Sequence, residues 1–600
     1  MERQDQDMVS THAHDWRSSF QSIVKEALEL PFTFEKAFSD KNIRLYSAFH
    51  PKHVVKTFAD LSAQLFQHPE IWESTYNHFF KETTKLGEYF IRRLWGETPS
   101  PHYTPDRKDR RFRDKVWEEN PFFDTAKQMY LMLCEAVLHS CTTLHTTDPL
   151  LKRKRHFFVR QLLDSCAPTN FIFSNPVVLR ALFESGGLNF IHGTERFLSD
   201  LNRGKGKLNI ASTDTSFFEV GKDLAATPGK VIFQNDILQL IQYAPTTETV
   251  QKRPVLIIPP WINKYYILDL KPENSFVKWL VSTGVTVFMI SWVKATPHHA
   301  HKSFEDYMRE GIFDSLTAIH QATKATSANI IGYCLGGTLL LNALAYCLHP
   351  KCAEKPKMRV ASATLLTTLT DFRDAGDLTI LADDEELSHI EKCMAQEGFL
   401  NGKILFDTFN VLRANDLIWS YFVDSYLLGK TPPPHDILFW NADVTNMPRA
   451  LHSFILRNFY RKNLLVQPNA LKIRGVPIDL QRIHLPIFML STRDDHIAPW
   501  KATYTATQFL KSPDLTFVLA GSGHVAGIIN PPAAQKYGYW TYNAYPSSAE
   551  DWLAYAKETS GSWWPTWRQW LEKYAGGYVS ARFPKENLVL ENAPGTYVLD

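Results

Sequence analysis

Two patterns of hydrophobic and polar positions divide the chain. Residues 1–102 place apolar and aromatic side chains at helical spacing among mixed charges, and the same periodicity continues through Phe123–Leu144 and Arg153–Cys166. From about residue 215, short apolar or β-branched runs alternate with helical stretches. Alternation of this kind predicts a largely parallel sheet with helices on both faces. We therefore expect a mostly helical N-terminal domain over residues 1–214, followed by an α/β domain.

The α/β part is interrupted once. The pattern changes near Asp371 into a mostly helical, aromatic-rich stretch, and strand-like runs return near Leu485. The predicted strands are Val231–Phe233, Ile237–Tyr243, Val255–Ile258, Val285–Trp292, Ala328–Tyr333, Val360–Leu369, Leu485–Ser491 and Leu515–Ala520. This predicts a first part of the core over 215–372, a cap or lid insertion over 373–480, and a second part with C-terminal helices over 481–600. The active site of such a sheet lies at the carboxyl ends of its strands.

The run SANIIGYCLGG at Ser327–Gly337 has the pattern of a nucleophile elbow. A predicted strand ends in glycine-flanked Cys334 and passes directly into TLLLNALAYCL, which has helical periodicity. The pattern is G-x-S-x-G with Cys in the Ser position. Small residues permit the sharp turn, and the positive end of the helix favours a thiolate. The alternative is a buried structural cysteine in a glycine-rich strand end.

Two later strand ends supply partners for a thiol nucleophile. In α/β-hydrolases the catalytic acid and then the histidine follow the nucleophile along the chain. Leu485–Ser491 runs into TRDDH, which offers Asp494 and Asp495 as the acid, and Leu515–Ala520 runs into GSGH, which ends at His524. The order and the placement predict a triad of Cys334, His524 and one of the two aspartates.

An oxyanion hole is expected beside the elbow. Its first donor should be the backbone N–H of Leu335, the residue after the nucleophile. The second should come from the loop Pro259–Tyr266 that follows an earlier strand, where Trp261 or Ile262 would supply the amide. The sequence leaves open which of the two does so.

A thiol nucleophile favours acyl transfer over hydrolysis. Transfer of an acyl group from a coenzyme A thioester to Cys334 is nearly isoenergetic and keeps the group activated. An alcohol then accepts the group downhill, provided that water is excluded, and the aromatic cap offers a means of exclusion.

Composition limits the remaining classes of function. The chain has 65 Lys and Arg against 63 Asp and Glu, a balance that argues against electrostatic binding of nucleic acid. Its seven cysteines show no C-x-x-C spacing, which predicts reduced thiols in the cytosol and no metal site. The N-terminus lacks a secretory pattern and no apolar run is long enough to form a transmembrane segment.

Many short motifs in this chain resemble those of one enzyme family. They are DRRF at Asp109–Phe112, PTNFIFSNP with ESGG at Pro168–Gly187, FEVGKDLAATPGKVIFQND at Phe218–Asp236, PPWINKYYILDLKP at Pro259–Pro272, GYCLGG at Gly332–Gly337, LLTTLTDF at Leu365–Phe372, FWNADVTNMP at Phe439–Pro448, RDDHIAPW at Arg493–Trp500, GSGHVAGIINPP at Gly521–Pro532 and GSWWPTW at Gly561–Trp567. From about residue 105 onward the chain resembles class I polyhydroxyalkanoate synthases, which polymerise (R)-3-hydroxyacyl-coenzyme A in bacterial storage granules. Residues 1–100 match only as a variable helical region, of unassigned role. At Leu412–Asp416 the chain lacks the proline that the family usually has after the arginine.

The resemblance implies an α/β-hydrolase fold and a set of roles. Cys334 would carry the acyl group, His524 would act as its base, and Asp495 would orient His524 or help to activate the hydroxyl of the next monomer. Trp440 falls at a position linked in the family to the dimer contact. Coenzyme A enters as part of the substrate, so no cofactor is expected.

The partners implied by the resemblance are (R)-3-hydroxyacyl-CoA, most simply 3-hydroxybutyryl-CoA, the growing polyester chain and the granule surface. A homodimer and granule-associated proteins are implied as well, in the cytoplasm. The competing interpretations are a cysteine-dependent hydrolase, such as a thioesterase or an intracellular polyester depolymerase, and a non-catalytic granule-coating protein.

Overall fold

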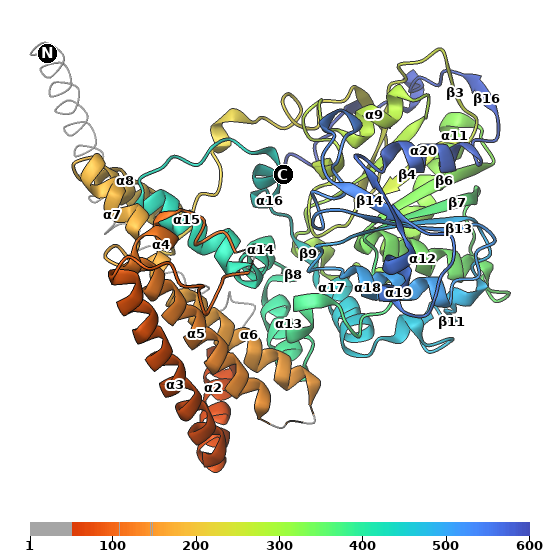
Figure 1. The fold of residues 1–600 in the computed structure, drawn as a ribbon. Helices are drawn as coiled ribbons and strands as arrows, with labels where there is room; N and C mark the ends of the chain where they lie inside the picture. The colour runs from red at the N-terminus through yellow and green to blue at the C-terminus, as the bar shows by residue number, and fades with distance from the viewer. Residues whose placement is uncertain (1–50, 107–108, 145, 147) are drawn as a thin grey trace, which may run out of the picture. The chain divides into compact units, whose positions relative to one another are not determined.

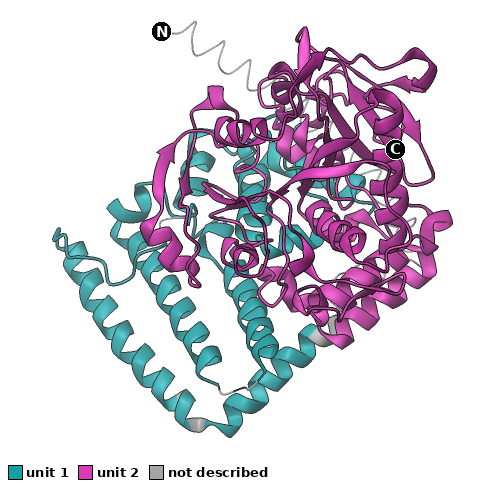
Figure 2. Cartoon of the chain, turned by 90° about the vertical axis from the view of Figure 1, so that its right-hand side faces the viewer, with its two compact units in different colours: residues 1–214, 407–434 teal, residues 215–406, 435–600 magenta. Residues whose placement is uncertain are grey.

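The computed structural model describes residues 51–600 apart from 107, 108, 145 and 147. The first half of the N-terminal segment predicted to be helical, residues 1–50, lies outside this range. The described residues form two compact units, which Figures 1 and 2 show. Unit 1 runs to Asp214 and includes Asp407–Pro434, and unit 2 consists of Thr215–Phe406 and His435–Asp600.

Unit 1 is built from helices. Its N-terminal part contains α2 (Pro51–Gln67), α3 (Pro69–Leu94), α4 (Val116–Glu119), α5 (Pro121–Thr143), α6 (Pro149–Ser165), α7 (Pro176–Glu184) and α8 (Leu188–Arg203). Three of these helices begin in the same way, with Pro at the first helical position and an Asn or Asp cap before it. The caps are Asn120, Asp148 and Asn175, whose side chains accept hydrogen bonds from free amides of the first turn. The helical pattern of the sequence therefore forms helices in the described part of this region.

Residues 407–434 pack within unit 1, although the sequence predicts them as part of one continuous cap over 373–480. The Tyr426 hydroxyl donates to the Asp200 carboxylate at 2.6 Å, and the Asn189 side chain donates to the Leu427 carbonyl at 2.7 Å. Gly193 on α8 permits this packing, because a Cβ there would lie 2.0 Å from the Tyr426 carbonyl oxygen. Hydrophobic periodicity contains no information about such pairings, so the sequence did not reveal that this part of the insertion belongs with the helical unit.

Unit 2 contains an 11-stranded mixed sheet (Figure 1) in the order β15-β14-β13-β12-β7-β6-β4-β5-β2-β1-β17. The strands are β1 (Gly229–Gln234), β2 (Leu238–Tyr243), β4 (Val255–Ile258), β5 (Val287–Trp292), β6 (Ser327–Tyr333), β7 (Arg359–Leu366), β12 (Ile487–Thr492), β13 (Leu515–Ala520), β14 (Gly538–Thr541), β15 (Lys557–Ser560) and β17 (Glu591–Asn592). The central strands β5, β4, β6, β7, β12 and β13 are parallel, and the outer strands pair antiparallel. Every strand predicted from the sequence is present.

The smaller elements of unit 2 include two-stranded sheets and the helices that flank the large sheet. The small strand pairs are β3 (Thr249–Gln251) with β16 (Tyr578–Ser580), β8 (Phe399–Leu400) with β9 (Met447–Pro448), and β10 (Lys472–Ile473) with β11 (Val476–Pro477). The main helices are α9 (Phe276–Ser282), α11 (Asp314–Thr323), α12 (Leu335–Leu348), α13 (Asp384–Glu397), α16 (Asp436–Ala442), α17 (Arg449–Ile455), α18 (Trp500–Tyr504), α19 (Ala549–Tyr555) and α20 (Trp564–Glu572). In this unit α9 and α20 lie on one face of the sheet and α12 lies on the other (Figure 1).

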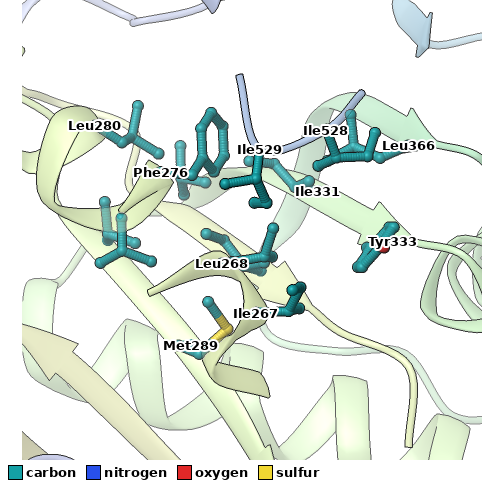
Figure 3. Packing of buried hydrophobic residues seen from close by; sticks show 14 of the residues in the cluster. Ile267, Leu268, Phe276, Leu280, Met289, Ile331, Tyr333, Leu366, Ile528 and Ile529 are labelled. Carbon is teal, nitrogen blue, oxygen red and sulfur yellow. The ribbon is translucent and has the colours of Figure 1, made fainter. Parts of the chain in front are cut away.

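The main apolar core of unit 2 lies between the parallel strands and the helices α9 and α20. Figure 3 shows Phe276 and Leu280 of α9 packed against strand residues such as Ile331. Trp563, Trp564 and Trp567 at the start of α20 are fully buried there. The indole N–H groups of Trp563 and Trp564 donate to the carbonyls of Gly527 and Ile528, each at 2.9 Å. The GSWWPTW motif thus fixes the loop that follows β13.

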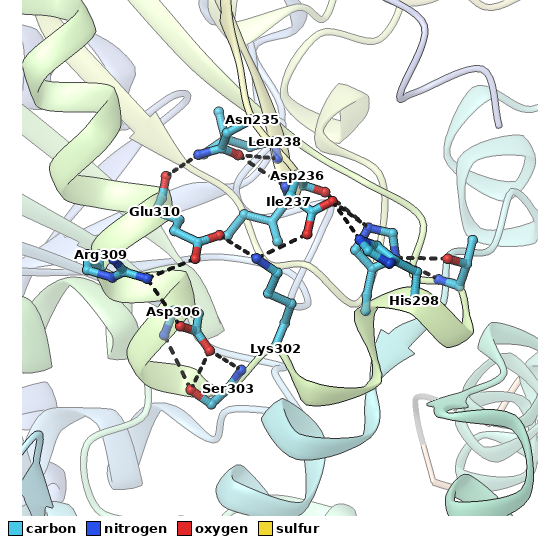
Figure 4. Close-up of polar contacts among 12 residues, drawn as sticks. Asn235, Asp236, Ile237, Leu238, His298, Lys302, Ser303, Asp306, Arg309 and Glu310 are labelled. Carbon is cyan, nitrogen blue, oxygen red and sulfur yellow. Dashed lines mark hydrogen bonds and ion pairs between the residues drawn. The ribbon is translucent and has the colours of Figure 1, made fainter.

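A polar network at the start of β2 joins the sheet to the helical segment 304–323 (Figure 4). The Lys302 ammonium lies 3.0 Å from the Asp236 carboxylate and 2.8 Å from that of Glu310, and its side chain is nearly buried. That segment consists of α10 (Phe304–Asp306), the π-helical turn η6 (Tyr307–Phe313) and α11. Since buried charges are stable only when paired, the network holds η6 in a fixed position beside the sheet.

Candidate active site

Cys334 occupies the turn between β6 and α12. Its backbone has φ +53° and ψ −121°, and it is one of the few non-glycine residues with positive φ in the described chain. The Cys334 amide donates to the Leu366 carbonyl at the end of β7, at 2.9 Å. Strained backbone of this kind persists only where the surroundings hold it, and here it presents a half-buried thiol at the N-terminus of α12.

The glycines of the elbow are required by close backbone approach. A Cβ on Gly332 would lie 2.4 Å from the Cα of Gly337. A Cβ on Gly336 would lie 2.1 Å from the carbonyl oxygen of Ile258, the last residue of β4. The start of α12 therefore lies directly against the start of the loop Pro259–Tyr266. This contact brings Cys334 and the predicted oxyanion loop together.

His524 and Asp495 form a buried pair at the carboxyl ends of β13 and β12. The His524 Nδ1 lies 2.7 Å from the Asp495 Oδ2. The other carboxylate oxygen of Asp495 accepts the backbone N–H groups of Ile497 and Ala498, at 2.9 and 2.8 Å. Asp494 is exposed, and its amide donates to the Ser522 carbonyl at 2.9 Å. Of the two aspartates that the sequence offers, Asp495 is the one that contacts the histidine.

The electrostatics of the pair favour a protonated His524 beside an ionised Asp495. Burial alone would lower the pKa of His524, but the charges of Asp495 and Cys334, with their hydrogen bonds, raise it to about 10. Burial would raise the pKa of Asp495, yet the positive His524 and the two backbone amides keep it below its usual value. With Nδ1 turned to Asp495, the Nε2 of His524 is the atom that can serve the Cys334 sulfur.

Two tyrosines lie near the Cys334 thiol. The sequence analysis singled out neither of them. The ring of Tyr333, the last residue of β6, stacks on the His524 ring with centroids 5.6 Å apart. Tyr460 lies in the π-helical turn η10 (Leu456–Arg461), and burial and the nearby Cys334 charge both raise the pKa of its phenol. Phe372, which follows β7, packs edge-on against Tyr460 at 5.0 Å. Tyr333 was available from the sequence because it precedes the nucleophile, whereas nothing in the local pattern distinguishes Tyr460.

The predicted oxyanion donors lie on opposite sides of the contact between α12 and the loop. Leu335 is the first residue of α12, so its amide has no acceptor within the helix. The Trp261 side chain is buried among aromatic rings, of which Tyr307 is the nearest at 5.3 Å, while Ile262 is half-buried. Which amide, that of Trp261 or that of Ile262, completes the hole remains a prediction.

Neither metal binding nor a membrane span is seen in the described residues. Within the range 51–600 with its four gaps, no group of three or more His, Cys, Asp or Glu side chains is arranged to hold a metal ion. In the same range no helix combines the length and the apolarity needed to cross a bilayer.

The parallel sheet, the strained elbow and the acid–histidine pair define an α/β-hydrolase fold, and a family model described as alpha/beta hydrolase fold matches residues 280–531. A second model, described as Poly-beta-hydroxybutyrate polymerase (PhaC) N-terminus, matches residues 108–280. The chain belongs to the poly(3-hydroxyalkanoate) polymerase family, as similarity to whole proteins shows.

Three relatives illustrate the extent of the similarity. The poly(3-hydroxyalkanoate) polymerase subunit PhaC of Rhizobium etli is 44% identical over 91% of this chain and 86% of its own length. The poly(3-hydroxyalkanoate) polymerase of Methylorubrum extorquens is 44% identical over 90% of each chain. The poly(3-hydroxyalkanoate) polymerase subunit PhaC of Cupriavidus necator is 40% identical over 82% of this chain and 83% of its own. These matches confirm the family that the sequence motifs indicated.

Proposed function

We propose that this chain polymerises (R)-3-hydroxyacyl groups, with 3-hydroxybutyryl as the simplest substrate, taking them from coenzyme A thioesters and releasing coenzyme A. The family supports the polymerase activity, and the arrangement of Cys334, His524 and Asp495 supports a route through a cysteine thioester. Coenzyme A is a portion of the substrate and then a product, and the proposed route uses no cofactor.

Acyl loading begins after the Cys334 thiol has transferred its proton to His524. The Cys334 thiolate attacks the thioester carbonyl, and the negative charge that develops on its oxygen is stabilised by the amides of Leu335 and the loop Pro259–Tyr266. The bond between the carbonyl carbon and the coenzyme A sulfur then breaks, and the leaving thiolate takes the proton from His524. Asp495 stabilises the imidazolium for as long as His524 holds the proton, because its carboxylate lies 2.7 Å from Nδ1.

Elongation uses the same groups to transfer the acyl group from Cys334 to a hydroxyl group. A hydroxyl group of the incoming unit or of the chain gives its proton to the neutral His524 and attacks the thioester on Cys334. An oxyester bond forms, the bond to the Cys334 sulfur breaks, and the thiolate is regenerated. Each step from thioester to oxyester is downhill in free energy. Because water could attack the same thioester, polymer forms only if water does not compete for the acyl group.

Aromatic side chains provide the dry surroundings that this route requires. Phe372 stacks on Phe459 at 5.4 Å, and Phe459 packs edge-on against Phe304 at 5.3 Å. Together with Tyr460, these rings extend from the neighbourhood of the thiol to the cluster around Trp261. These rings are buried, so they keep water away from this side of the thiol.

The observation that carries the proposal is the buried His524–Asp495 pair beside a thiol at a strained elbow, within a chain of this family. The test is incubation of the purified protein with (R)-3-hydroxybutyryl-coenzyme A while released thiol and turbidity are followed together, with Cys334→Ala as the control. We expect thiol release with growing insoluble polyester, and neither in the variant. Thiol release into a clear solution containing free hydroxy acid would instead identify a hydrolase, and full activity of Cys334→Ala would refute the thioester route.

The same family supports proposals about assembly and place. We propose that the enzyme works as a homodimer on the surface of cytoplasmic storage granules, in contact with its polymer and with granule-associated proteins. Sedimentation of the enzyme with the insoluble polyester after turnover, compared with enzyme kept without substrate, tests the surface association.

A further inference from the structure

A partly buried ion pair joins the predicted oxyanion loop to the segment that follows α16. The Lys264 ammonium lies 2.7 Å from one oxygen of the Asp443 carboxylate, and the Tyr266 hydroxyl donates to the other oxygen at 2.7 Å. The Lys264 side chain is 8% exposed and that of Asp443 is 25% exposed. The Asp443 carboxylate thus contacts the loop at two positions, Lys264 and Tyr266. Both lie within a few residues of Trp261 and Ile262.

Two backbone contacts strengthen the same connection. The indole N–H of Trp440 on α16 donates to the Lys264 carbonyl at 2.8 Å, and Asn263 forms an isolated antiparallel bridge with Val444. Trp440 is 5% exposed and belongs to the main apolar core of this unit. The position that the family resemblance links to a dimer contact is therefore occupied here by a side chain that holds the loop from within the same chain.

The other end of the loop is fixed by the elbow and the sheet. The backbone of Gly336 packs directly against the Ile258 carbonyl, with no space for a side chain between them. The Trp292 indole N–H donates to the Pro259 carbonyl at 2.8 Å. The amides of Trp261 and Ile262 lie between these two anchored ends. The direction in which they point therefore depends on both anchors, and the Asp443 anchor is the only one of the two made by a charge.

We propose that Asp443 is a positioning residue for acyl transfer: through Lys264 and Tyr266 it holds the loop so that a backbone amide is aimed at the oxygen that becomes negative. This rests on the proposed function, because only a reaction at a carbonyl develops that charge. Asp443 does not touch the reacting atoms. Since a displacement of about 1 Å at a catalytic group reduces rates by about 100-fold, loosening one anchor is expected to slow acylation by about 10- to 100-fold.

The test separates two reactions of the same thiol. Acylation of Cys334 by (R)-3-hydroxybutyryl-coenzyme A passes through an oxyanion, whereas alkylation by iodoacetamide is a displacement at a saturated carbon and needs no oxyanion donor. Both rates are measured on the full-length enzyme, by intact mass and rapid quench. For Asp443→Asn we expect acylation to fall by about 10- to 100-fold while alkylation stays within about twofold of the unmodified enzyme.

The chain provides a matched control. Glu572 also accepts hydrogen bonds from a cation and a tyrosine, those of Arg568 and Tyr578, but it lies on α20 and none of its contacts involves the loop. Glu572→Gln should leave both rates unchanged, and Asp443→Glu should recover part of the acylation rate. Trp440→Phe removes the donor to the Lys264 carbonyl together with part of a buried ring. It provides a second test if Asp443→Asn folds poorly, and its stability and oligomeric state are measured by denaturation and light scattering.

Three results would overturn the inference. Unchanged acylation in Asp443→Asn and Trp440→Phe would show that the anchor does not set the rate. An equal fall of acylation and alkylation would point to general damage to the Cys334–His524 pair. Absence of any acylation in the unmodified enzyme, with normal alkylation, would refute the proposed function itself, and the positioning role would fall with it.

Discussion

Gly336 provides a sharp test of the geometry of the elbow, because two physical effects predict opposite results there. Gly336 is the second residue of α12, and replacing glycine by alanine inside a helix ordinarily adds about 1 kcal/mol of stability. In this structure, however, the added carbon would lie 2.1 Å from the Ile258 carbonyl oxygen, far inside any normal non-bonded separation. The added carbon would be fixed to the backbone of α12, and the oxygen belongs to the backbone at the end of β4, so neither can move by a side-chain rotation.

The clash must be relieved by moving α12 away from the end of β4 by about 1 Å. We expect Gly336→Ala to reduce the free energy of unfolding by about 1–3 kcal/mol, as overpacking does. Because the same movement separates Cys334 from the oxyanion loop, the rate of acylation should fall by about 100-fold or more.

Gly523 is the matched control. It directly precedes His524, but a Cβ there would meet nothing closer than the Asp494 carbonyl oxygen at 3.8 Å. Gly523→Ala should therefore change the free energy of unfolding by less than about 0.5 kcal/mol and leave acylation close to normal. The measurements are chemical denaturation and single-turnover acylation of both variants. A stable and active Gly336→Ala protein would refute the close contact between α12 and β4.

Three further predictions concern the buried acid–histidine pair. His524→Gln should slow alkylation of Cys334 at neutral pH by at least about tenfold, and a normal rate would exclude His524 as the base. Asp495→Asn should slow both acylation and elongation by about 100-fold or more, whereas Asp494→Asn should slow neither; the reverse pattern would move the role to Asp494. Because the His524 pKa is raised from 6.5 to about 10, its contribution to stability is complete below pH 6.5 and is lost as the pH rises through about 10. The difference in unfolding free energy between the unmodified enzyme and His524→Gln should shrink over that upper range, and a constant difference would contradict the charged pair.

The sequence predicted those features of the core that depend on local pattern. Apolar runs such as Ile487–Thr492 are buried along their whole length, as central parallel strands are, and so they stand out from their neighbours. The strand β15, Lys557–Ser560, lies in the C-terminal part of the chain, for which the sequence predicts helices. It is a polar edge strand with mostly exposed side chains, so it shows no apolar alternation from which it could be recognised.

The sequence was sufficient to select candidate residues for the site, but not the contacts that hold the surrounding loop in place. Chain order and strand ends were enough to select Cys334 and His524, and the structure then showed that Asp495 faces the histidine. Contacts such as that between Lys264 and Asp443 join residues far apart in the sequence. Periodicity and spacing cannot predict such a contact, because it forms only when the insertion that contains Asp443 packs against the loop that contains Lys264.

The central claim is that the growing acyl group is carried on the sulfur of Cys334. The most direct measurement is intact-protein mass spectrometry after brief exposure to (R)-3-hydroxybutyryl-coenzyme A, followed by peptide mapping and treatment with hydroxylamine. The account predicts added hydroxyacyl mass on the peptide that contains Cys334, removed by hydroxylamine and absent from Cys334→Ala. Polymer formation without any such adduct, or an adduct located on another residue, would contradict it.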